Sequence, residues 1–240
     1  GTLLKTFTGS SGNQLGNYVN MNGNHLAIAA PAYQAYRGII YIYDLANNYS
    51  SVANISGPAG GSGFGDMTFT NNYFIVSAPT YPSFASRGVV YVYNRTNYQL
   101  LYNITGENDG DWFGSPFWVN TNMLLASSAG YPAGQYNGKM YLYNLSNGSR
   151  VNGFGPVGIT VGSALGYDGA LSDQYVGVIS DGTFSNSGGY IYYMGNLTLA
   201  VDVSDNSTST MIHDIALSDK YIVITGYDGS SINGTVQVYS

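Results

Sequence analysis

A block of about 50 residues recurs along this chain of 240 residues. Its clearest copy runs from Gly63 to Gly106 and holds four short apolar runs separated by turn residues. The tyrosine that ends the third run recurs at Tyr43, Tyr93, Tyr143, Tyr193 and Tyr239. Each block leaves an apolar face that only a neighbouring block can cover, so a repeat of this length indicates a β-propeller. The sequence therefore predicts an all-β fold, a five-bladed β-propeller.

We expect a single β-propeller domain over residues 1–240. Its blades are predicted at about 10–57, 58–106, 107–153, 154–204 and 205–240. The last copy ends on its third run, whereas Thr2–Thr8 resembles a fourth run without earlier strands. We therefore expect residues 1–9 to close the ring beside the last run, because an uncovered edge strand promotes aggregation. Donation of this strand to a second molecule is the alternative.

Within each copy the second run is apolar throughout, as in Phe74–Ala78, which is typical of a strand buried on both faces. The third run alternates tyrosine with isoleucine, valine or leucine, which predicts a strand with two different faces. Asn, Asp and Gly separate the first run from the second and suit tight hairpin turns. Each of the first four copies opens with a hydrophobe-glycine pair: Leu15-Gly16, Phe64-Gly65, Phe113-Gly114 and Leu165-Gly166. The fifth copy reads Ile212-His213 at this place.

Three of these motifs together carry a family resemblance. They are the Phe-Gly pair, a buried run ending in Ala29-Ala30-Pro31 or Ser77-Ala78-Pro79, and glycine followed by hydrophobe-hydrophobe-Tyr-hydrophobe-Tyr. Over nearly its whole length the chain resembles the FG-GAP repeats of integrin α-subunit β-propellers and their microbial relatives. Those integrin propellers have seven blades, and several carry an Asp-rich calcium loop between the first two strands. Only short turns stand there in this chain, so we carry over the propeller but neither calcium binding nor ligand binding in the integrin manner.

Composition narrows the classes of partner. Charged residues make up 8% of the chain and the net charge is −6, with only seven Lys and Arg. Few phosphates could be neutralised, so we expect no nucleic acid partner. Cysteine is absent, which rules out disulfides and thiolate metal sites. We find no apolar stretch of transmembrane length. The chain starts at Gly1, so we expect a processed product or a fragment.

The sequon Asn-x-Ser/Thr occurs more often than the composition predicts. With 24 asparagines and 42 Ser or Thr, about four are expected by chance, whereas nine are present. They lie at Asn48, Asn54, Asn94, Asn103, Asn144, Asn147, Asn196, Asn206 and Asn233. Most fall in the hairpins between third and fourth runs or on the fourth run itself, which are exposed parts of a propeller. We therefore expect N-linked glycans and an extracellular location, secreted or at the cell surface. The alternative is that Asn and Ser simply suit turns.

Aromatic residues gather in the loops between second and third runs. They are Tyr33, Tyr36, Tyr81, Phe84, Tyr131, Tyr136, Phe184 and Tyr227. These loops should ring one end of the propeller, where exposed aromatic side chains suit recognition of a sugar or a protein. The competing interpretation is that they fold over the blade ends and seal the core.

Catalysis and metal binding find little support. The densest acidic run, Glu107–Asp111, lacks the length and the closing bidentate Glu of a calcium loop, so we expect a solvated turn. His25 and His213 are the only histidines, which leaves a histidine-based triad poorly supplied. Asp66 and Asp214 follow the opening pairs and could line a channel, but Glu107 is the only glutamate. We expect no catalytic residues, no metal and no cofactor, and the pair His213-Asp214 to be a polar plug.

The sequence thus predicts a non-enzymatic, glycosylated extracellular β-propeller that serves adhesion, a surface coat or fibre assembly. The expected partners are an extracellular protein or glycan, or further copies of the chain. The alternative is a carbohydrate-binding propeller of the lectin type that uses the aromatic loops. A hydrolase ranks third.

Overall fold

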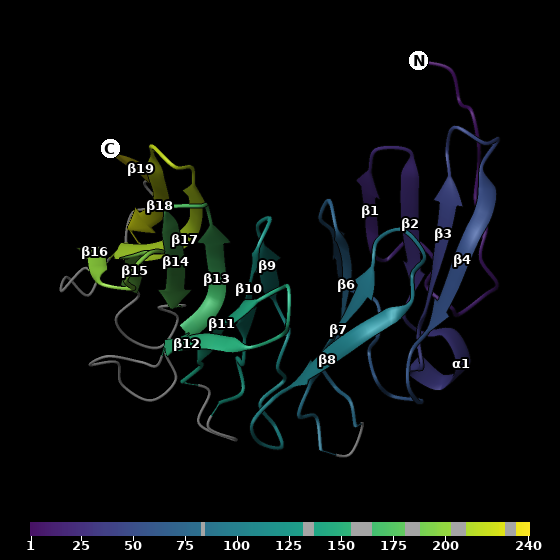
Figure 1. Ribbon diagram of the computed structural model, residues 1–240, viewed down its shortest axis with the longest axis horizontal. Helices are drawn as coiled ribbons and strands as arrows, with labels where there is room; N and C mark the ends of the chain where they lie inside the picture. Colours follow the sequence, from purple (N-terminus) through teal and green to yellow (C-terminus); the bar gives the residue numbers. More distant parts are fainter. Residues whose placement is uncertain (83–84, 132–136, 155–164, 181–187, 203–209, 229–233) are drawn as a thin grey trace. The chain divides into compact units, whose positions relative to one another are not determined.

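The structure is a computed structural model and describes the chain except residues 83–84, 132–136, 155–164, 181–187, 203–209 and 229–233 (Figure 1). The chain forms two compact units, Gly1–Thr105 and Gly106–Ser240. The predicted side chains of Phe84, Tyr136, Phe184, Asn206 and Asn233 lie outside the described residues, and so does the side chain of Tyr227.

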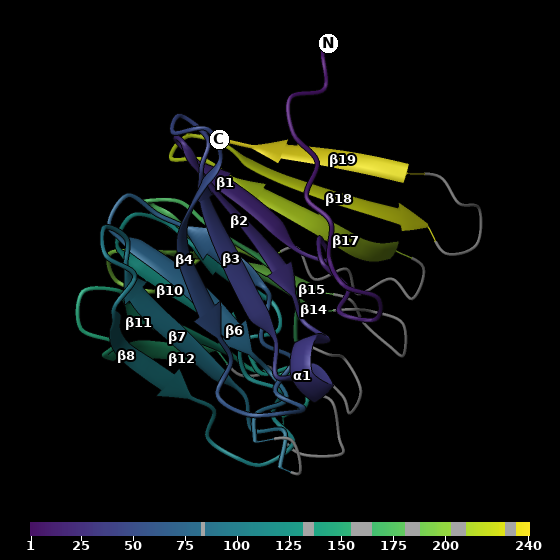
Figure 2. The same ribbon diagram turned by 90° about the vertical axis from the view of Figure 1, so that its right-hand side faces the viewer.

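The first unit holds two antiparallel four-stranded sheets whose strands pair in chain order. The first sheet consists of β1 (Val19–Asn22), β2 (His25–Ala30), β3 (Ile39–Asp44) and β4 (Ser50–Ser56). The second consists of β5 (Met67–Phe69), β6 (Tyr73–Ala78), β7 (Val89–Asn94) and β8 (Leu100–Thr105). A single helical turn, α1 (Tyr33–Tyr36), joins β2 to β3 and lies at the end of the first sheet, as Figure 2 shows.

The second unit holds three antiparallel sheets, of four, four and three strands among the residues that are described. The first consists of β9 (Phe117–Val119), β10 (Met123–Ser127), β11 (Met140–Asn144) and β12 (Arg150–Phe154). The next consists of β13 (Leu165–Leu171), β14 (Tyr175–Ser180), β15 (Gly188–Tyr193) and β16 (Leu199–Asp202). The last consists of β17 (Thr210–Leu217), β18 (Ile222–Asp228) and β19 (Gly234–Tyr239).

The prediction of an all-β chain built of five antiparallel sheets is therefore confirmed for the described residues. Closure of these sheets into a ring stays a prediction. Residues 1–9 adopt no regular structure and β19 is paired with β18, so the expected pairing of Thr2–Thr8 with β19 also stays a prediction. The ring of Phe7 packs against Tyr43 of the first sheet, with 4.4 Å between centroids. Residues 1–6 are exposed, so water can satisfy their backbone groups without a strand partner.

The apolar second run of each copy becomes the buried second strand of its sheet. In β6 every residue from Phe74 to Ala78 is buried, because this strand has a paired strand on each side and side chains on both faces. The third strand shows the predicted alternation: in β3, Ile40 and Ile42 are fully buried, whereas Tyr41 and Tyr43 on the other face are half-buried.

The hydrophobe-glycine pair connects the start of a sheet to its second and third strands. Phe64 and Phe113 are fully buried, and each ring lies edge-on against a third-strand tyrosine of its own sheet, 5.9 Å from Tyr91 and 6.0 Å from Tyr141. The amide of the following glycine donates to the second strand, as in the 2.8 Å bond from Gly114 to Ser127. Gly114 has a φ of 87°, which favours glycine. The motif is therefore a packed corner with a backbone conformation that a side chain would strain.

A second glycine, at the start of the third strand, fits one sheet to the next within a unit. A Cβ atom built on Gly38 would lie 2.1 Å from the carbonyl oxygen of Phe64, and one on Gly138 would lie 1.9 Å from that of Leu165. No side chain fits at such distances. Glycine there lets the third strand of one sheet approach the opening residue of the following sheet.

Hydrogen bonds join the turns at the end of the sheet where the first strand meets the second and the third strand ends. In four sheets the residue after the third strand donates its amide to the turn between first and second strands. These bonds run from Leu45 to Asn24, Arg95 to Asn72, Leu145 to Asn122 and Met194 to Gln174. In the second unit neighbouring sheets are also linked, since Asn120 Nδ2 donates to the carbonyl of Ser172 (3.0 Å). These turns thus form an ordered end of each sheet.

Across the described residues, none of the helical structure reaches the length and apolar character that a membrane span requires.

Candidate functional site

Seven of the nine predicted glycosylation sites lie in the described residues, and all of them are at the surface. Asn54 and Asn103 are exposed on the outer strands β4 and β8. The others lie at or within the connections between third and fourth strands: Asn48, Asn94, Asn144, Asn147 and Asn196. Asn94 and Asn144 are partly exposed and the other three are exposed. The hairpin and outer-strand positions expected from the sequence therefore hold for these residues, whereas their glycosylation stays a prediction.

Four of these asparagines stabilise their own turn. The Oδ1 atoms of Asn94, Asn144, Asn147 and Asn196 each accept a hydrogen bond from the backbone amide two residues later. The distances lie between 2.8 Å for Thr96 and 3.1 Å for Thr198. Such a bond closes an Asx turn and explains why asparagine suits these places. The amide nitrogen Nδ2, which a glycan would be joined to, takes no part in these bonds.

The backbone bond of the Asx turn does not by itself require the hydroxyl residue of the sequon. Asp44 makes the same bond to the amide of Ala46 (2.9 Å), and Asn97 makes it to that of Gln99 (3.0 Å). Since a backbone amide is the donor, any residue except proline can stand two positions on. At two sequons the hydroxyl also takes part in the turn, since those of Ser146 and Thr198 donate to the Oδ1 atoms of Asn144 (2.7 Å) and Asn196 (2.8 Å).

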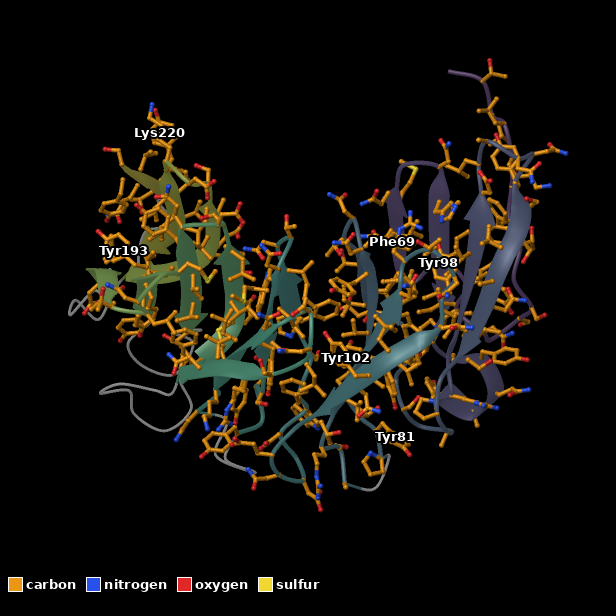
Figure 3. The ribbon with its side chains drawn as sticks, viewed as in Figure 1. Phe69, Tyr81, Tyr98, Tyr102, Tyr193 and Lys220 are labelled. Carbon is orange, nitrogen blue, oxygen red and sulfur yellow. The ribbon has the colours of Figure 1, made fainter. Side chains whose placement is uncertain are left out.

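The predicted aromatic loop residues that are described do not share one environment. Tyr36 is 58% exposed, whereas Tyr33, Tyr81 and Tyr131 are half-buried. Tyr81 packs against the buried core of the first unit, and its position at the edge of that unit's fold is visible in Figure 3. Lys139 Nζ lies 4.9 Å from the ring centre of Tyr131. Tyr81 and Tyr131 therefore both contact the body of their own unit.

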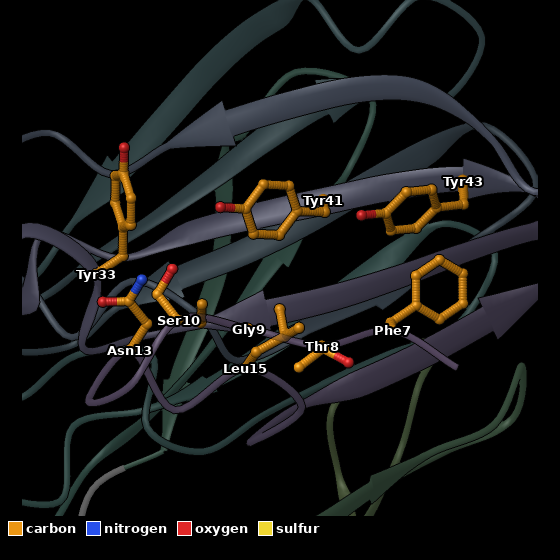
Figure 4. A pocket seen from close by; sticks show the side chains of 10 residues that line it. Phe7, Thr8, Gly9, Ser10, Asn13, Leu15, Tyr33, Tyr41 and Tyr43 are labelled. Atoms are coloured by element: carbon orange, nitrogen blue, oxygen red, sulfur yellow. The ribbon is translucent and has the colours of Figure 1, made fainter. Parts of the chain in front are cut away.

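Tyr33 is the loop residue that the structure brings into a cavity. A cavity of about 270 Å³ lies between the segment 7–15 and the tyrosine face of β3. Figure 4 shows Tyr33, Tyr41 and Tyr43 along it, with Phe7 beside Tyr43. The remaining lining residues are Thr8, Gly9, Ser10, Asn13, Leu15 and Ala30. Sequence reasoning missed this site, although the two tyrosines on one face of a predicted strand were a signal for it.

The three phenols of the cavity lie near one another. The pKa of Tyr41 is raised by burial first and then by the neighbouring phenols of Tyr33 and Tyr43. In Figure 4 the hydroxyl groups of Tyr41 and Tyr43 point along the strand toward Tyr33, while Ser10 and Asn13 lie near the base of that ring. The cavity thus combines aromatic rings with hydroxyl and amide groups.

The acidic run of the third sheet is engaged in local bonds. Glu107 accepts from the Tyr141 hydroxyl (2.7 Å) and forms ion pairs with Lys139 (3.2 Å) and Arg150. The hydrogen bond from Tyr141 holds the pKa of this carboxyl below its usual range, although burial opposes this shift. Asp111 is fully buried, and its Oδ2 accepts from the backbone amide of Asn108 (2.9 Å). The expected solvated turn is therefore wrong for Asp111, whereas Glu107 is exposed and also ion-paired.

Two aspartates in the second unit share a hydrogen bond. Asp168 on β13 and Asp214 on β17 interact through their carboxyl groups, and the amide of Ile215 donates to Asp168 Oδ2 (3.2 Å). Burial, and then this contact with Asp214, raises the pKa of Asp168 to about 6. The rings of Tyr167 and His213 meet edge-on beside the pair, 6.3 Å apart. Of the two carboxylates proposed for a channel, Asp66 lies in the other unit, where burial raises its pKa.

Metal ligands do not gather in the described part of the chain: it holds no group of three or more His, Asp or Glu side chains placed to bind one ion.

A cationic cluster that sequence reasoning missed joins the two sheets of the first unit. Arg95 donates to the Tyr98 hydroxyl (2.7 Å) and to the carbonyl of Asn22 (3.0 Å), and His25 hydrogen-bonds to the same hydroxyl. The guanidinium also lies 4.4 Å from the ring centre of Phe69, which is close to Tyr98 in Figure 3. Burial, and then the charge of Arg95, lowers the pKa of His25. Leu45, Leu145 and Met194 stand at this position in three other sheets and Ser240 in the last, so the arginine is specific to one sheet.

Comparison with known proteins finds no family model that matches this chain and no match among curated proteins.

Proposed function

We propose that this chain is a non-enzymatic, N-glycosylated extracellular module that serves adhesion, a surface coat or fibre assembly. The observation that carries the proposal is the coincidence of sequons with surface hairpins and outer strands. Seven described sequons lie where a bulky sugar would meet solvent and not the core.

The chemistry of the turns supports glycosylation over composition alone. The turn also forms without a hydroxyl residue two positions later, as at Asp44 and Asn97, although the hydroxyls of Ser146 and Thr198 add a bond to it. The recurrence of Ser or Thr there is what an oligosaccharide-transferring enzyme requires. With only 8% charged residues, such a surface gains hydration from sugars. Attachment of N-glycans in the secretory pathway accounts for the proposed extracellular location.

We further propose that the five sheets close into a five-bladed propeller, with residues 1–9 as the fourth strand of the last sheet. The last sheet has three described strands, and its edge strand β19 exposes Val236 (67%) and Val238 (64%). The amino-terminal segment in turn exposes Leu3 (79%) and Leu4 (77%). Each element has apolar side chains and backbone groups that a strand partner would satisfy. The FG-GAP resemblance adds to this proposal.

The proposal is tested by mass spectrometry of the protein isolated from its native source. Enzymatic release of N-glycans in heavy-oxygen water converts an occupied asparagine to a mass-labelled aspartate. We expect label at Asn94, Asn144 and Asn196. Asn97 is the internal control, since it is exposed in an equivalent turn but has no hydroxyl residue two positions on. Bare asparagines at all three sequons would refute the proposal.

A further inference from the structure

The tyrosine-lined cavity of the first unit has the composition of a small recognition site. Its ten lining residues include no Lys, Arg, His, Asp or Glu. A phosphate, a carboxylate or a metal ion would find no opposite charge there, so the ligand must be neutral. Phenol, hydroxyl and amide groups can both donate and accept hydrogen bonds, which suits a ligand with several hydroxyl groups.

The aromatic rings define the shape of that ligand. Tyr33, Tyr41, Tyr43 and Phe7 offer aromatic rings, and the hydroxyl groups of the three tyrosines lie at intervals along the row. The faces of such rings are slightly negative and attract C–H groups, of which a sugar ring carries several on one side. The volume of about 270 Å³ corresponds to about nine water molecules and lies just below that of pockets for drug-sized ligands. One sugar ring fits better than an extended chain.

The cavity exists because the first copy of the repeat departs from the next two. In the second and third sheets the opening phenylalanine packs edge-on against the first tyrosine of the third strand, as Phe64 does against Tyr91. The first sheet has Leu15 at this position, facing Tyr41 across the cavity. A smaller side chain leaves the phenol of Tyr41 open to a ligand, whereas Tyr141, under Phe113, is fully buried.

We propose that this cavity binds one neutral sugar residue, stacked on Tyr43 and hydrogen-bonded by the hydroxyl groups of Tyr41 and Tyr33 and by Ser10 and Asn13. This site goes beyond the scaffold role proposed above. All its residues lie between 7 and 43 and none of them is a sequon asparagine, so it does not depend on glycosylation of the chain.

The test measures binding of four sugars to the whole chain by saturation-transfer NMR. Glucose, galactose, mannose and N-acetylglucosamine serve as probes at millimolar concentration. We expect at least one of them to bind. Leu15→Phe should abolish that binding, because it places in the cavity the ring that the second and third sheets already carry. The same substitution agrees with the repeat and should leave the fold intact, which circular dichroism checks.

A second variant tests the hydrogen bonds without changing the volume. Tyr41→Phe removes one hydroxyl and should weaken the sugar by about tenfold, the value of one hydrogen bond of about 1.4 kcal/mol. Tyr91→Phe, at the equivalent place in the second sheet, is the matched control and should bind as the original does. Failure of all four sugars to bind, or equal binding by folded Leu15→Phe, would overturn the proposal. Neither result would bear on the glycan map that tests the scaffold role.

Discussion

Removing the ionisable group of Asp168 should stabilise the second unit at neutral pH. The carboxyl has a pKa raised to about 6, chiefly by burial and then by its contact with Asp214. A raised pKa means that the folded state holds the proton more tightly than the unfolded state. Its contribution to stability is therefore complete below the ordinary pKa of 3.8 and is lost as the pH rises through about 6.

The size of this effect follows from the shift. About two pKa units correspond to about 3 kcal/mol as an upper limit. Asp168 is only partly buried, and solvent screening reduces the expected value to about 1–2 kcal/mol. Asp168→Asn keeps a carbonyl oxygen for the amide of Ile215 and offers Asp214 a donor. At pH 7 this variant should therefore be about 1–2 kcal/mol more stable, and at pH 5 the gain should be smaller.

Urea unfolding followed by tryptophan fluorescence measures the effect in the correct unit. The chain has two tryptophans, Trp112 and Trp118, and both lie in the second unit. Trp118 packs against the core cluster that contains Leu165, three residues before Asp168. Asp173→Asn, the same substitution at an exposed turn of that unit, is the control and should leave the pH profile unchanged. Parallel profiles of the original and Asp168→Asn between pH 5 and 7 would refute the reasoning.

Three further predictions concern the first unit and the chain ends. If residues 1–9 cover β19 as proposed, deleting them should cause aggregation, which size-exclusion chromatography would detect. A monomer with unchanged melting by circular dichroism would argue against ring closure. Because the pKa of His25 is lowered, its contribution to stability is present above pH 6.5 and is lost as the pH falls. The melting temperature of His25→Gln should therefore depend less on pH between 7 and 5 than that of the original chain. An equal dependence would show that another group causes the loss of stability in acid. Arg95→Leu introduces the residue found at Leu45 and Leu145. It should lower the free energy of unfolding in urea by about 1–2 kcal/mol, because the bonds to Tyr98 and Asn22 are lost. An unchanged free energy would show that the cluster does not stabilise the unit.

Most of the strands and turns could be predicted from local patterns in the sequence. The apolar run Phe74–Ala78 predicts a strand in the middle of a sheet, and the strand is buried there. The alternation around Tyr41 and Tyr43 predicts a strand with one buried and one half-buried face, as the structure has it. Asn and Gly mark the turns through their backbone preferences. These signals lie within about ten residues of one another, so the strands could be predicted from the sequence without knowing any tertiary contact.

The missed sites depend on contacts between distant residues. Phe7 meets Tyr43, and Asp168 meets Asp214, across tens of residues of chain. The partners of Glu107 were missed for the same reason, because residues 139, 141 and 150 supply them. Predicting such sites requires the side-chain positions of neighbouring strands, which repeat spacing alone does not provide.

The glycines at the start of the third strands also bear on how the five copies could diverge after duplication. At Gly38 and Gly138 the neighbouring carbonyl oxygen leaves no room for a Cβ atom, so a mutation there would strain two copies at once. The opening residue that each glycine faces is less restricted and varies along the chain from Phe64 to Leu165. The side chain at the opening position can therefore change in size from copy to copy, whereas the close contact between the glycine and the carbonyl oxygen of that position cannot change. New cavities in such a chain should arise at opening positions, one copy at a time.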